Sequence, residues 1–134
     1  RFDEVMVREI EQHLGIPKPT FLYYYPAEYA ALERLKENDP GFAERFEIYV
    51  GGLELANAFS ELTDVSEQEA RFERDRFERK RLGKTVYPLP ERFLEALAHM
   101  PNSVGIAFGL DRLAMVFFNA GKIDEVISFS PEEL

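Results

Sequence analysis

The chain has 134 residues, of which 46% are hydrophobic and 13% aromatic, so it is long enough to form one globular domain or a large part of one. It contains no cysteine, which excludes disulfides and thiolate metal sites, and its formal net charge of −9 argues against broad binding to nucleic-acid backbones. No apolar run is long enough to span a bilayer and no signal-peptide pattern opens the chain, so we expect no membrane association and a cytoplasmic location.

The first third of the chain is expected to form a helix, a strand and a mixed segment. Apolar residues recur at helical spacing over Phe2–Leu14, and Gly15 follows as a C-terminal stop. Thr20–Tyr25 is aromatic and favours a strand. Ala27–Gly41 is expected to be a short helix followed by a loop, with a turn at its Asn-Asp-Pro-Gly end.

A β-hairpin is expected in the middle of the chain. Two β-favouring runs, Arg45–Val50 and Leu53–Glu61, flank the pair Gly51-Gly52. Glycine accepts the positive φ angles that a two-residue hairpin turn requires, so this pair is expected to form the turn.

The second half is expected to begin with a long charged helix over Glu67–Leu82, with Ser66 and Glu69 as its capping box and Gly83 as its end. Its basic residues are interpreted as a solvated helix face. They are Arg71, Arg74, Arg76, Arg79, Lys80 and Arg81. The elements expected after it are a helix at Pro90–His99, a buried strand at Ser103–Gly109, an apolar helix at Leu110–Asn119 and a strand or turn at Ile123–Phe129.

The hairpin carries two carboxylates on one face. With Gly51-Gly52 as the turn, side-chain alternation places Glu47, Tyr49, Glu54 and Ala56 on the same face. Glu47 and Glu54 are then diagonal neighbours, with Cα atoms roughly 7–8 Å apart. Mg²⁺ commonly uses one or two carboxylates together with substrate phosphates. The geometry therefore permits a magnesium–nucleotide site, and a solvent-exposed face with two ordinary glutamates is the alternative.

The polar residues after the turn change parity. Asn57 and Glu61 share a face with each other but not with Glu54 in a regular strand. If all three line one cleft, a β-bulge must lie between Glu54 and Asn57. The alternative is a regular strand with a polar residue at each end.

Small residues alternate along the late strand. Gly105, Ala107 and Gly109 leave one face open for a flat ligand or another backbone. Arg112 follows in the first turn of the next helix, where its guanidinium can stack on a purine or pair with phosphate oxygens. The alternative is a tightly packed core strand followed by an ordinary surface pair of Asp111 and Arg112.

Three segments together resemble one protein family. They are FLYYYPAE (Phe21–Glu28), RFEIYVGGLELANAFSELTD (Arg45–Asp64) and GIAFGLDRLAM (Gly105–Met115). They resemble the lysyl-tRNA synthetases and their paralogue, the elongation factor P lysine ligase, and the last one resembles motif 3 of class II synthetases. The resemblance implies an α+β fold, with an antiparallel β-sheet flanked by helices. Residues 1–134 are expected to be the C-terminal portion of the catalytic domain, a fragment that includes motif 3 and lacks motifs 1 and 2.

The resemblance also implies the reaction and the nucleotide site. The family activates a lysine-type amino acid with ATP and Mg²⁺ as an adenylate, and then transfers the acyl group to an acceptor. Glu47 and Glu54 are placed on Mg-ATP as metal ligands. Arg112 is placed on ATP as a stacking and charge-stabilising group, so that Arg112 and Glu54 are the expected catalytic residues. Gly109 is expected to keep the pocket floor open.

The amino-acid substrate is placed by the same resemblance against Asn57, Phe59, Glu61 and Ala107. Glu61 is a natural partner for an ammonium group. Ala107 stands where motif 3 usually has glycine, and its methyl group reshapes the pocket. Alanine at this position is similar to the ligase branch, which activates (R)-β-lysine and passes it to a lysine of elongation factor P.

Two other functions remain open on the sequence. The segment ELANAFSEL (Glu54–Leu62) is equally similar to several bacterial lysyl-tRNA synthetases, for which tRNA is the acceptor. A synthetase-like binding module without catalysis is the other alternative. The full-length protein is expected to be a homodimer, and the 134 residues alone are expected to be inactive in pyrophosphate exchange.

Overall fold

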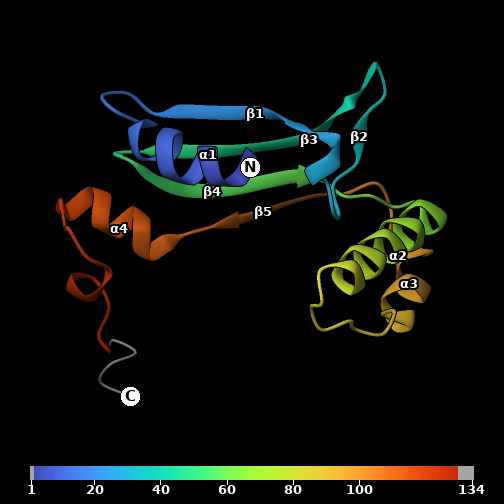
Figure 1. The fold of residues 1–134 in the computed structure, drawn as a ribbon. Helices are drawn as coiled ribbons and strands as arrows, with labels where there is room; N and C mark the ends of the chain where they lie inside the picture. The colour runs from blue at the N-terminus through green and yellow to red at the C-terminus, as the bar shows by residue number, and fades with distance from the viewer. Residues whose placement is uncertain (1, 130–134) are drawn as a thin grey trace. The chain divides into compact units, whose positions relative to one another are not determined.

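The structure is a computed structural model that describes residues 2–129. Its strands form an antiparallel sheet in the order β1-β3-β4-β5, and β2 pairs with β3 (Figure 1). The strands are β1 (Thr20–Pro26), β2 (Leu35–Lys36), β3 (Asp39–Val50), β4 (Leu53–Ser60) and β5 (Val104–Phe108). The longer helices are α2 (Val65–Arg81), α3 (Glu91–Leu97) and α4 (Leu110–Phe118). This arrangement confirms the expected α+β fold.

The chain divides into two compact units. The first contains the segment up to Tyr23, the hairpin segment Phe46–Ala58 and the segment from Ile106 onward. The second contains Tyr24–Arg45 and Phe59–Gly105. Each unit is described by itself below. None of the helices in residues 2–129 combines the length and apolar character that crossing a lipid bilayer requires.

The predicted N-terminal helix is present, but its winding changes along its length. It begins as α1 (Phe2–Val5), continues as a wider π-type turn, η1 (Met6–Ile10), and ends as a tight 3-10 turn, η2 (Glu11–His13). Gly15 follows with φ +76°, as the predicted stop requires. A Cβ atom at Gly15 would lie 2.6 Å from the carbonyl carbon and oxygen of Tyr49, so only glycine permits this approach to β3.

The predicted hairpin is confirmed. Gly51 and Gly52 have φ angles of +60° and +81°, both in the left-handed region. Their amide groups donate 3.0 Å hydrogen bonds to the carbonyl oxygens of Gly15 and Leu14, which joins the end of the first helix to the turn.

The segment before the hairpin differs from the prediction. Only a short 3-10 turn, η3 (Ala27–Tyr29), is helical, and β3 begins at Asp39, earlier than expected. The reason is pairing with β2, in which Leu35 lies opposite Ala43 and Lys36 opposite Asp39. The turn therefore falls at Glu37–Asn38, and the Asp-Pro-Gly residues that were expected to form it open the strand instead.

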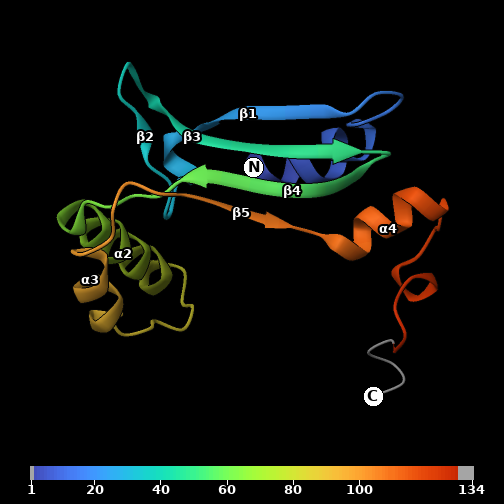
Figure 2. The same cartoon turned by 180° about the vertical axis from the view of Figure 1, so that it is seen from behind.

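The long charged helix α2 has a different cap from the one predicted. The carboxylate of Asp64 accepts the amide hydrogen of Glu67 at 2.9 Å, so the Ser66–Glu69 capping box is wrong and the helix begins earlier. Gly83, with φ +65°, follows the helix as predicted. Figures 1 and 2 show α2 and α3 side by side, and the rings of Phe72 and Phe93 lie 5.9 Å apart between them.

Strand β5 was expected to be buried, and this is wrong. Val104, Ile106 and Phe108 are all exposed, so the described residues do not cover the face of β5 from which these alternate side chains project. Helix α4 is apolar as expected, yet Leu110, Phe117 and Phe118 are also exposed. The final segment forms a turn, η4 (Ile123–Glu125), which is the second of the two forms expected there.

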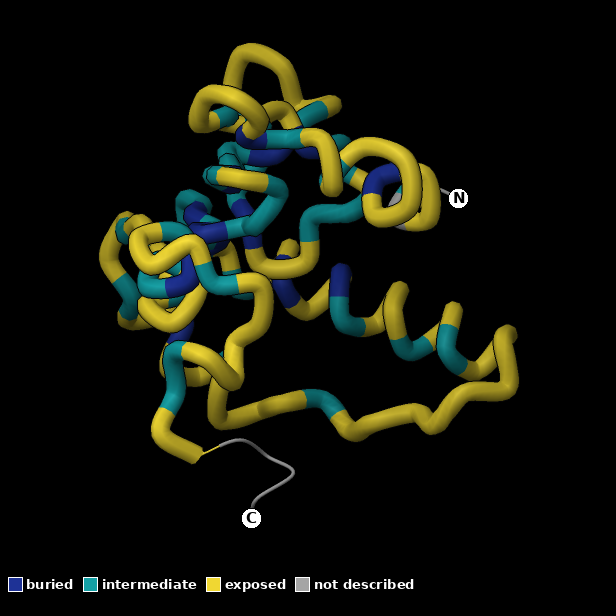
Figure 3. Tube along the Cα trace, turned by 90° about the vertical axis from the view of Figure 1, so that its left-hand side faces the viewer, coloured by how far each residue is buried: buried dark blue, intermediate teal, exposed yellow. Residues whose placement is uncertain are grey.

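Buried residues are confined to short stretches of the trace (Figure 3), and about half of them lie in the strands. In the first unit they include Tyr49, Leu55, Ala56 and Met115. In the second they include Tyr25, Ala43, Leu62 and Leu97.

Candidate functional site

Glu47 and Tyr49 form a buried hydrogen-bonded pair on β3. Alternation along the strand points both side chains to one face, as the sequence predicted, and they are 6% and 2% exposed. The Tyr49 hydroxyl donates a 2.7 Å hydrogen bond to Oε2 of Glu47. This face is therefore not an ordinary solvent-exposed surface at Glu47.

The electrostatic surroundings of Tyr49 show that several carboxylates are near it. Its pKa is raised far above the usual value, first by burial and then by the hydrogen bond to Glu47. The negative charges of Glu47, Glu11 and Glu54 raise it further. The phenol therefore stays protonated at neutral pH and remains a hydrogen-bond donor. Tyr49 was predicted to share a face with the two acids, but its donor role was missed.

Arg112, at the start of α4, lies against the beginning of β4. Its Nη1 donates a 2.8 Å hydrogen bond to the main-chain oxygen of Glu54 and lies 3.5 Å from Oε2 of the same residue. The Arg112 side chain is 50% exposed, so part of the guanidinium is open to a ligand. These contacts bring together Glu54 and Arg112, which are separated by 58 residues in sequence.

Gly109 holds the turn between β5 and α4 close to β4. Its amide donates a 2.8 Å hydrogen bond to the main-chain oxygen of Leu55. A Cβ atom at Gly109 would lie 3.4 Å from Cδ of Arg112, so the arginine side chain passes directly over this glycine. This is an ordinary van der Waals distance, so packing against Arg112 does not itself require glycine, and the role of Gly109 in the pocket floor stays a prediction.

The donor chemistry of this face fits a magnesium ion shared with a nucleotide. Among the described residues, no group of three or more His, Asp or Glu side chains is arranged to hold a metal ion. Glu47 and Glu54 carry hard carboxylate oxygens, and Mg²⁺ commonly takes one or two carboxylate ligands and completes its shell with phosphate oxygens and water. The two carboxylates therefore suit a magnesium ion that is also coordinated by the phosphates of a nucleotide.

Asn57 lies in β4 with an unsatisfied polar atom. Its Oδ1 is buried and accepts no hydrogen bond from the part of the chain that the structure describes. A buried amide oxygen without a donor is unfavourable, so this atom is available to a ligand N–H group. β4 runs without interruption from Leu53 to Ser60, and the bulge expected between Glu54 and Asn57 stays a prediction.

Glu61 belongs to the second unit and lies over the backbone of β5. A Cβ atom at Gly105 would lie 2.6 Å from Oε1 of Glu61, so the carboxylate occupies the space that this glycine leaves open. The main-chain amide of Glu61 donates a 3.0 Å hydrogen bond to the carbonyl of Ser103. Phe59, also in the second unit, is half-buried, and Ala107, in the first, is exposed on β5.

The predicted basic face of α2 is largely neutralised by neighbouring acids. Arg76 pairs with Glu73, Arg79 with Asp75 and Arg81 with Glu78, as expected of a solvated helix surface. Arg71 is the exception, because it is 7% exposed and bonds to Glu67 and to the main chain of the Ala30–Glu33 segment. No feature of the sequence distinguished Arg71 from the other basic residues.

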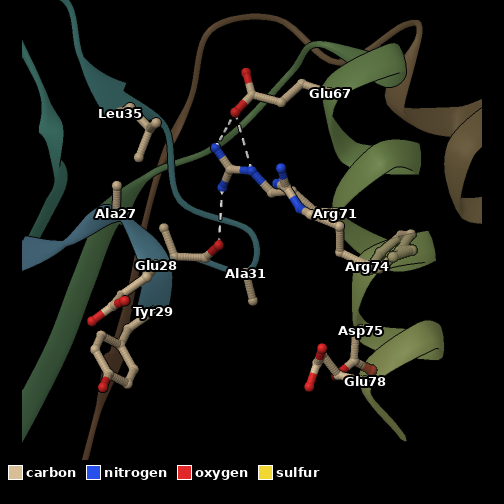
Figure 4. Close-up of a pocket in the computed structure, with 12 residues that line it drawn as sticks. Ala27, Glu28, Tyr29, Ala31, Leu35, Glu67, Arg71, Arg74, Asp75 and Glu78 are labelled. Carbon is tan, nitrogen blue, oxygen red and sulfur yellow. Dashed lines mark hydrogen bonds and ion pairs between the residues drawn. The ribbon is translucent and has the colours of Figure 1, made fainter. Parts of the chain in front are cut away.

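A cavity of about 820 Å³ lies beside Arg71 in the second unit (Figure 4). Its walls are the Ala27–Ala31 segment with Leu35 on one side and α2 on the other. None of the eight predicted site residues lines it. The cavity is therefore separate from the residues that the sequence singled out.

Comparison with known proteins gives the same family as the sequence motifs. The family model of the class II tRNA synthetases (D, K and N) matches residues 4–133. The chain is 47% identical over 126 residues to the elongation factor P–(R)-β-lysine ligase of Proteus mirabilis (strain HI4320), covering 93% of the chain and 39% of that protein. It is 49% identical over 124 residues to the ligase of the same name from Avibacterium paragallinarum, covering 92% of the chain and 38% of that protein.

The region that matches the family contains the residues of the site described above. The chain spans about two fifths of the length of these curated relatives, since it covers 39% and 38% of them. The matched region includes the hairpin with Glu47 and Glu54 and the β5–α4 segment with Arg112. The chain belongs to the class II tRNA synthetase family of the D, K and N type.

Proposed function

We propose that the protein is an ATP-dependent ligase that activates a lysine-type amino acid as its adenylate and transfers it to an acceptor. The observation that carries this proposal is the contact between Arg112 and Glu54, which places a half-exposed guanidinium beside a carboxylate of the predicted Mg-ATP face. Glu47 is buried in β3, and side-chain alternation predicts that it shares this face. Family membership supports the class of reaction.

In the first step the substrate carboxylate attacks the α-phosphorus of ATP. A bond forms between the carboxylate oxygen and phosphorus, the bond to the bridging oxygen breaks, and pyrophosphate leaves with that electron pair. A magnesium ion, when bound, neutralises charge on the phosphates, and Glu47 and Glu54 are the residues that would hold it. Arg112 donates hydrogen bonds to the phosphate oxygens or stacks on the adenine, so catalysis rests on positioning and charge stabilisation without a protein nucleophile.

The amino acid is proposed to bind through Asn57, Phe59, Glu61 and Ala107. The free Oδ1 of Asn57 is an acceptor for a substrate N–H group. The carboxylate of Glu61 provides a charge-assisted partner for an ammonium group, which selects a lysine-type substrate. Phe59 provides an apolar surface for the methylene groups.

The acceptor is proposed to be a lysine of elongation factor P, and the substrate (R)-β-lysine. The printed names of the relatives at 47% and 49% identity support this choice. In the second step the neutral acceptor amine attacks the acyl carbon and an amide bond forms. The bond from the acyl carbon to the phosphate oxygen breaks, AMP leaves with that electron pair, and the amine releases a proton to solvent. Transfer to tRNA is the second candidate, because the family model includes lysine-specific tRNA synthetases.

Amino-acid-dependent exchange of pyrophosphate into ATP tests the proposal in the full-length protein. We expect exchange with lysine or (R)-β-lysine, and a fall of at least about tenfold for each of Glu47→Ala, Glu54→Ala and Arg112→Ala, since each removes a charged contact to Mg-ATP. Glu95→Ala, an exposed acid on α3, is the control and should retain the wild-type rate. Wild-type rates in all three site variants would refute the assignment.

A further inference from the structure

Glu61, the proposed ammonium ligand, is held in place by a segment that sequence reasoning did not connect with the site. Glu33 lies opposite Glu61 in an isolated antiparallel bridge. The amide of Arg34 donates to the carbonyl of Ser60, and the amide of Leu62 donates to the carbonyl of Leu32, both at 2.8 Å. The position of the Glu61 backbone therefore depends on the Leu32–Arg34 segment on one side and on Ser103 on the other.

The Glu33 carboxylate is buried and bonded to its own chain segment. The residue is 5% exposed. Its Oε2 accepts hydrogen bonds from the amides of Ala31 at 2.7 Å and Leu32 at 2.9 Å, and its Oε1 accepts one from Arg45 at 3.1 Å. These three donors satisfy both oxygens of the buried carboxylate and hold it turned towards its own segment.

Two side chains of α2 fix the same segment from the other side. Nη1 of Arg71 donates to the carbonyl oxygens of Glu33 at 2.7 Å and Ala30 at 3.2 Å. Nε2 of Gln68, which is fully buried, donates to the carbonyl oxygen of Ala31 at 3.0 Å. A guanidinium and an amide thus satisfy main-chain oxygens that have no strand partner of their own.

The orientation of Glu33 also removes a like-charge conflict. Two carboxylates at directly opposed positions of an antiparallel pair repel each other. Here Glu33 turns to Arg45 and the amides of its own segment, whereas Glu61 lies over Gly105. The Glu61 carboxylate is left beside the open backbone of β5.

We propose that Glu33 and Arg71 are positioning residues that fix Glu61 for recognition of the side-chain ammonium group of the substrate. The inference rests on the proposed function and extends it to residues that do not touch the substrate. Loss of either residue releases the segment opposite Glu61, so the carboxylate is no longer held over Gly105. The ammonium group then loses its fixed partner, while the Mg-ATP face in the other unit keeps its own contacts.

Glu33→Gln tests this in the full-length protein, with KM for the amino acid and KM for ATP measured separately by pyrophosphate exchange. We expect KM for lysine to rise at least about fivefold, since one charge-assisted contact contributes about that factor or more, and KM for ATP to stay within about twofold. Selectivity for lysine over norleucine, which lacks the side-chain ammonium group, should fall by a similar factor. A substitution that only destabilises the fold lowers the fraction of active protein and leaves the selectivity for lysine over norleucine unchanged.

Arg71→Lys is the second variant, because it keeps the positive charge and loses the guanidinium that reaches two carbonyl oxygens. Like Glu33→Gln, it is expected to raise KM for the amino acid and to leave KM for ATP nearly unchanged. Glu73→Gln, which breaks the exposed pair with Arg76 on α2, is the matched control and should behave as wild type. Thermal unfolding of each variant establishes that the protein is folded at the assay temperature.

The outcomes separate the inference from the function on which it rests. The absence of exchange with both lysine and (R)-β-lysine in the wild-type protein would overturn the proposed function itself. An active wild type together with folded Glu33→Gln and Arg71→Lys variants of unchanged selectivity would overturn only the positioning role.

Discussion

At the scale of single residues, the hydroxyl of Tyr49 and the carboxylate of Glu47 form a buried pair beside the proposed magnesium position. The hydrogen bond is 2.7 Å long and occupies Oε2 of Glu47. It fixes the rotation of the carboxylate, because both side chains are almost completely buried. Tyr49 therefore orients the carboxylate of a proposed metal ligand.

Tyr49→Phe removes one oxygen atom and leaves the ring in place. We expect the free energy of unfolding to fall by about 1.5–3 kcal/mol, the usual contribution of a hydrogen bond to a charged group. The magnesium concentration for half-maximal pyrophosphate exchange should rise several-fold, because the Glu47 carboxylate loses its orientation. Urea unfolding and a magnesium titration measure the two effects in the full-length protein.

Tyr87→Phe is the control, since Tyr87 is exposed and its ring contact with Arg79 survives the change. The orienting role is wrong if Tyr49→Phe and Tyr87→Phe require the same magnesium concentration.

Sequence alternation was sufficient to place Glu47 and Tyr49 on one face of β3, because it depends only on the strand. That Glu54 and Ala56 share this face stays a prediction. Alternation was not sufficient to show that Glu47 is buried. The close approach of Gly15 to the main chain of Tyr49 joins segments 34 residues apart, and no periodicity records it. The burial of Arg71 and Glu33 was missed for the same reason, since both depend on contacts between distant segments.

At the scale of elements, the junction between the first helix and the β3–β4 hairpin depends on glycine. Gly15 needs glycine for two reasons, its φ angle of +76° and the 2.6 Å approach of a Cβ atom to the Tyr49 main chain. Gly51 has a similar φ angle of +60°, but nothing lies within 4 Å of an added Cβ. The two positions therefore separate the cost of the backbone conformation from the cost of a steric clash.

We expect Gly15→Ala to destabilise the protein by at least about 3 kcal/mol, and Gly51→Ala by about 1–2 kcal/mol, the usual cost of a left-handed conformation at a residue other than glycine. Chemical denaturation of both variants gives the comparison. Equal losses of stability would show that the main chain of Tyr49 does not lie against Gly15.

The helices and strands were largely predictable because their signals are local, as in the Gly-Gly turn and the apolar spacing of Leu110–Asn119. Features that depend on contacts with segments distant in the sequence could not be predicted. The burial of β5 was predicted from its apolar composition, although the described residues leave Val104, Ile106 and Phe108 uncovered on one face of the strand. The start of β3 depends on pairing with β2, and the composition of the Asp39–Gly41 segment favours a turn.

At the scale of the whole molecule, the proposed chemistry is divided between residues of two compact units. Glu47, Glu54 and Arg112 belong to the first, whereas Glu61 and its supporting residues Glu33 and Arg71 belong to the second. The division predicts separable effects, with nucleotide binding sensitive to changes in the first group and amino-acid selectivity sensitive to changes in the second.

The central claim is that Glu47, Glu54 and Arg112 bind a nucleotide together with magnesium, and calorimetric titration of the full-length protein with Mg-ATP tests it without reference to turnover. Glu54→Gln should raise Kd for Mg-ATP at least about tenfold, since a carboxylate next to the metal loses its charge, while Glu95→Gln on α3 should leave Kd unchanged. An unchanged Kd in folded Glu54→Gln at saturating magnesium would contradict the claim.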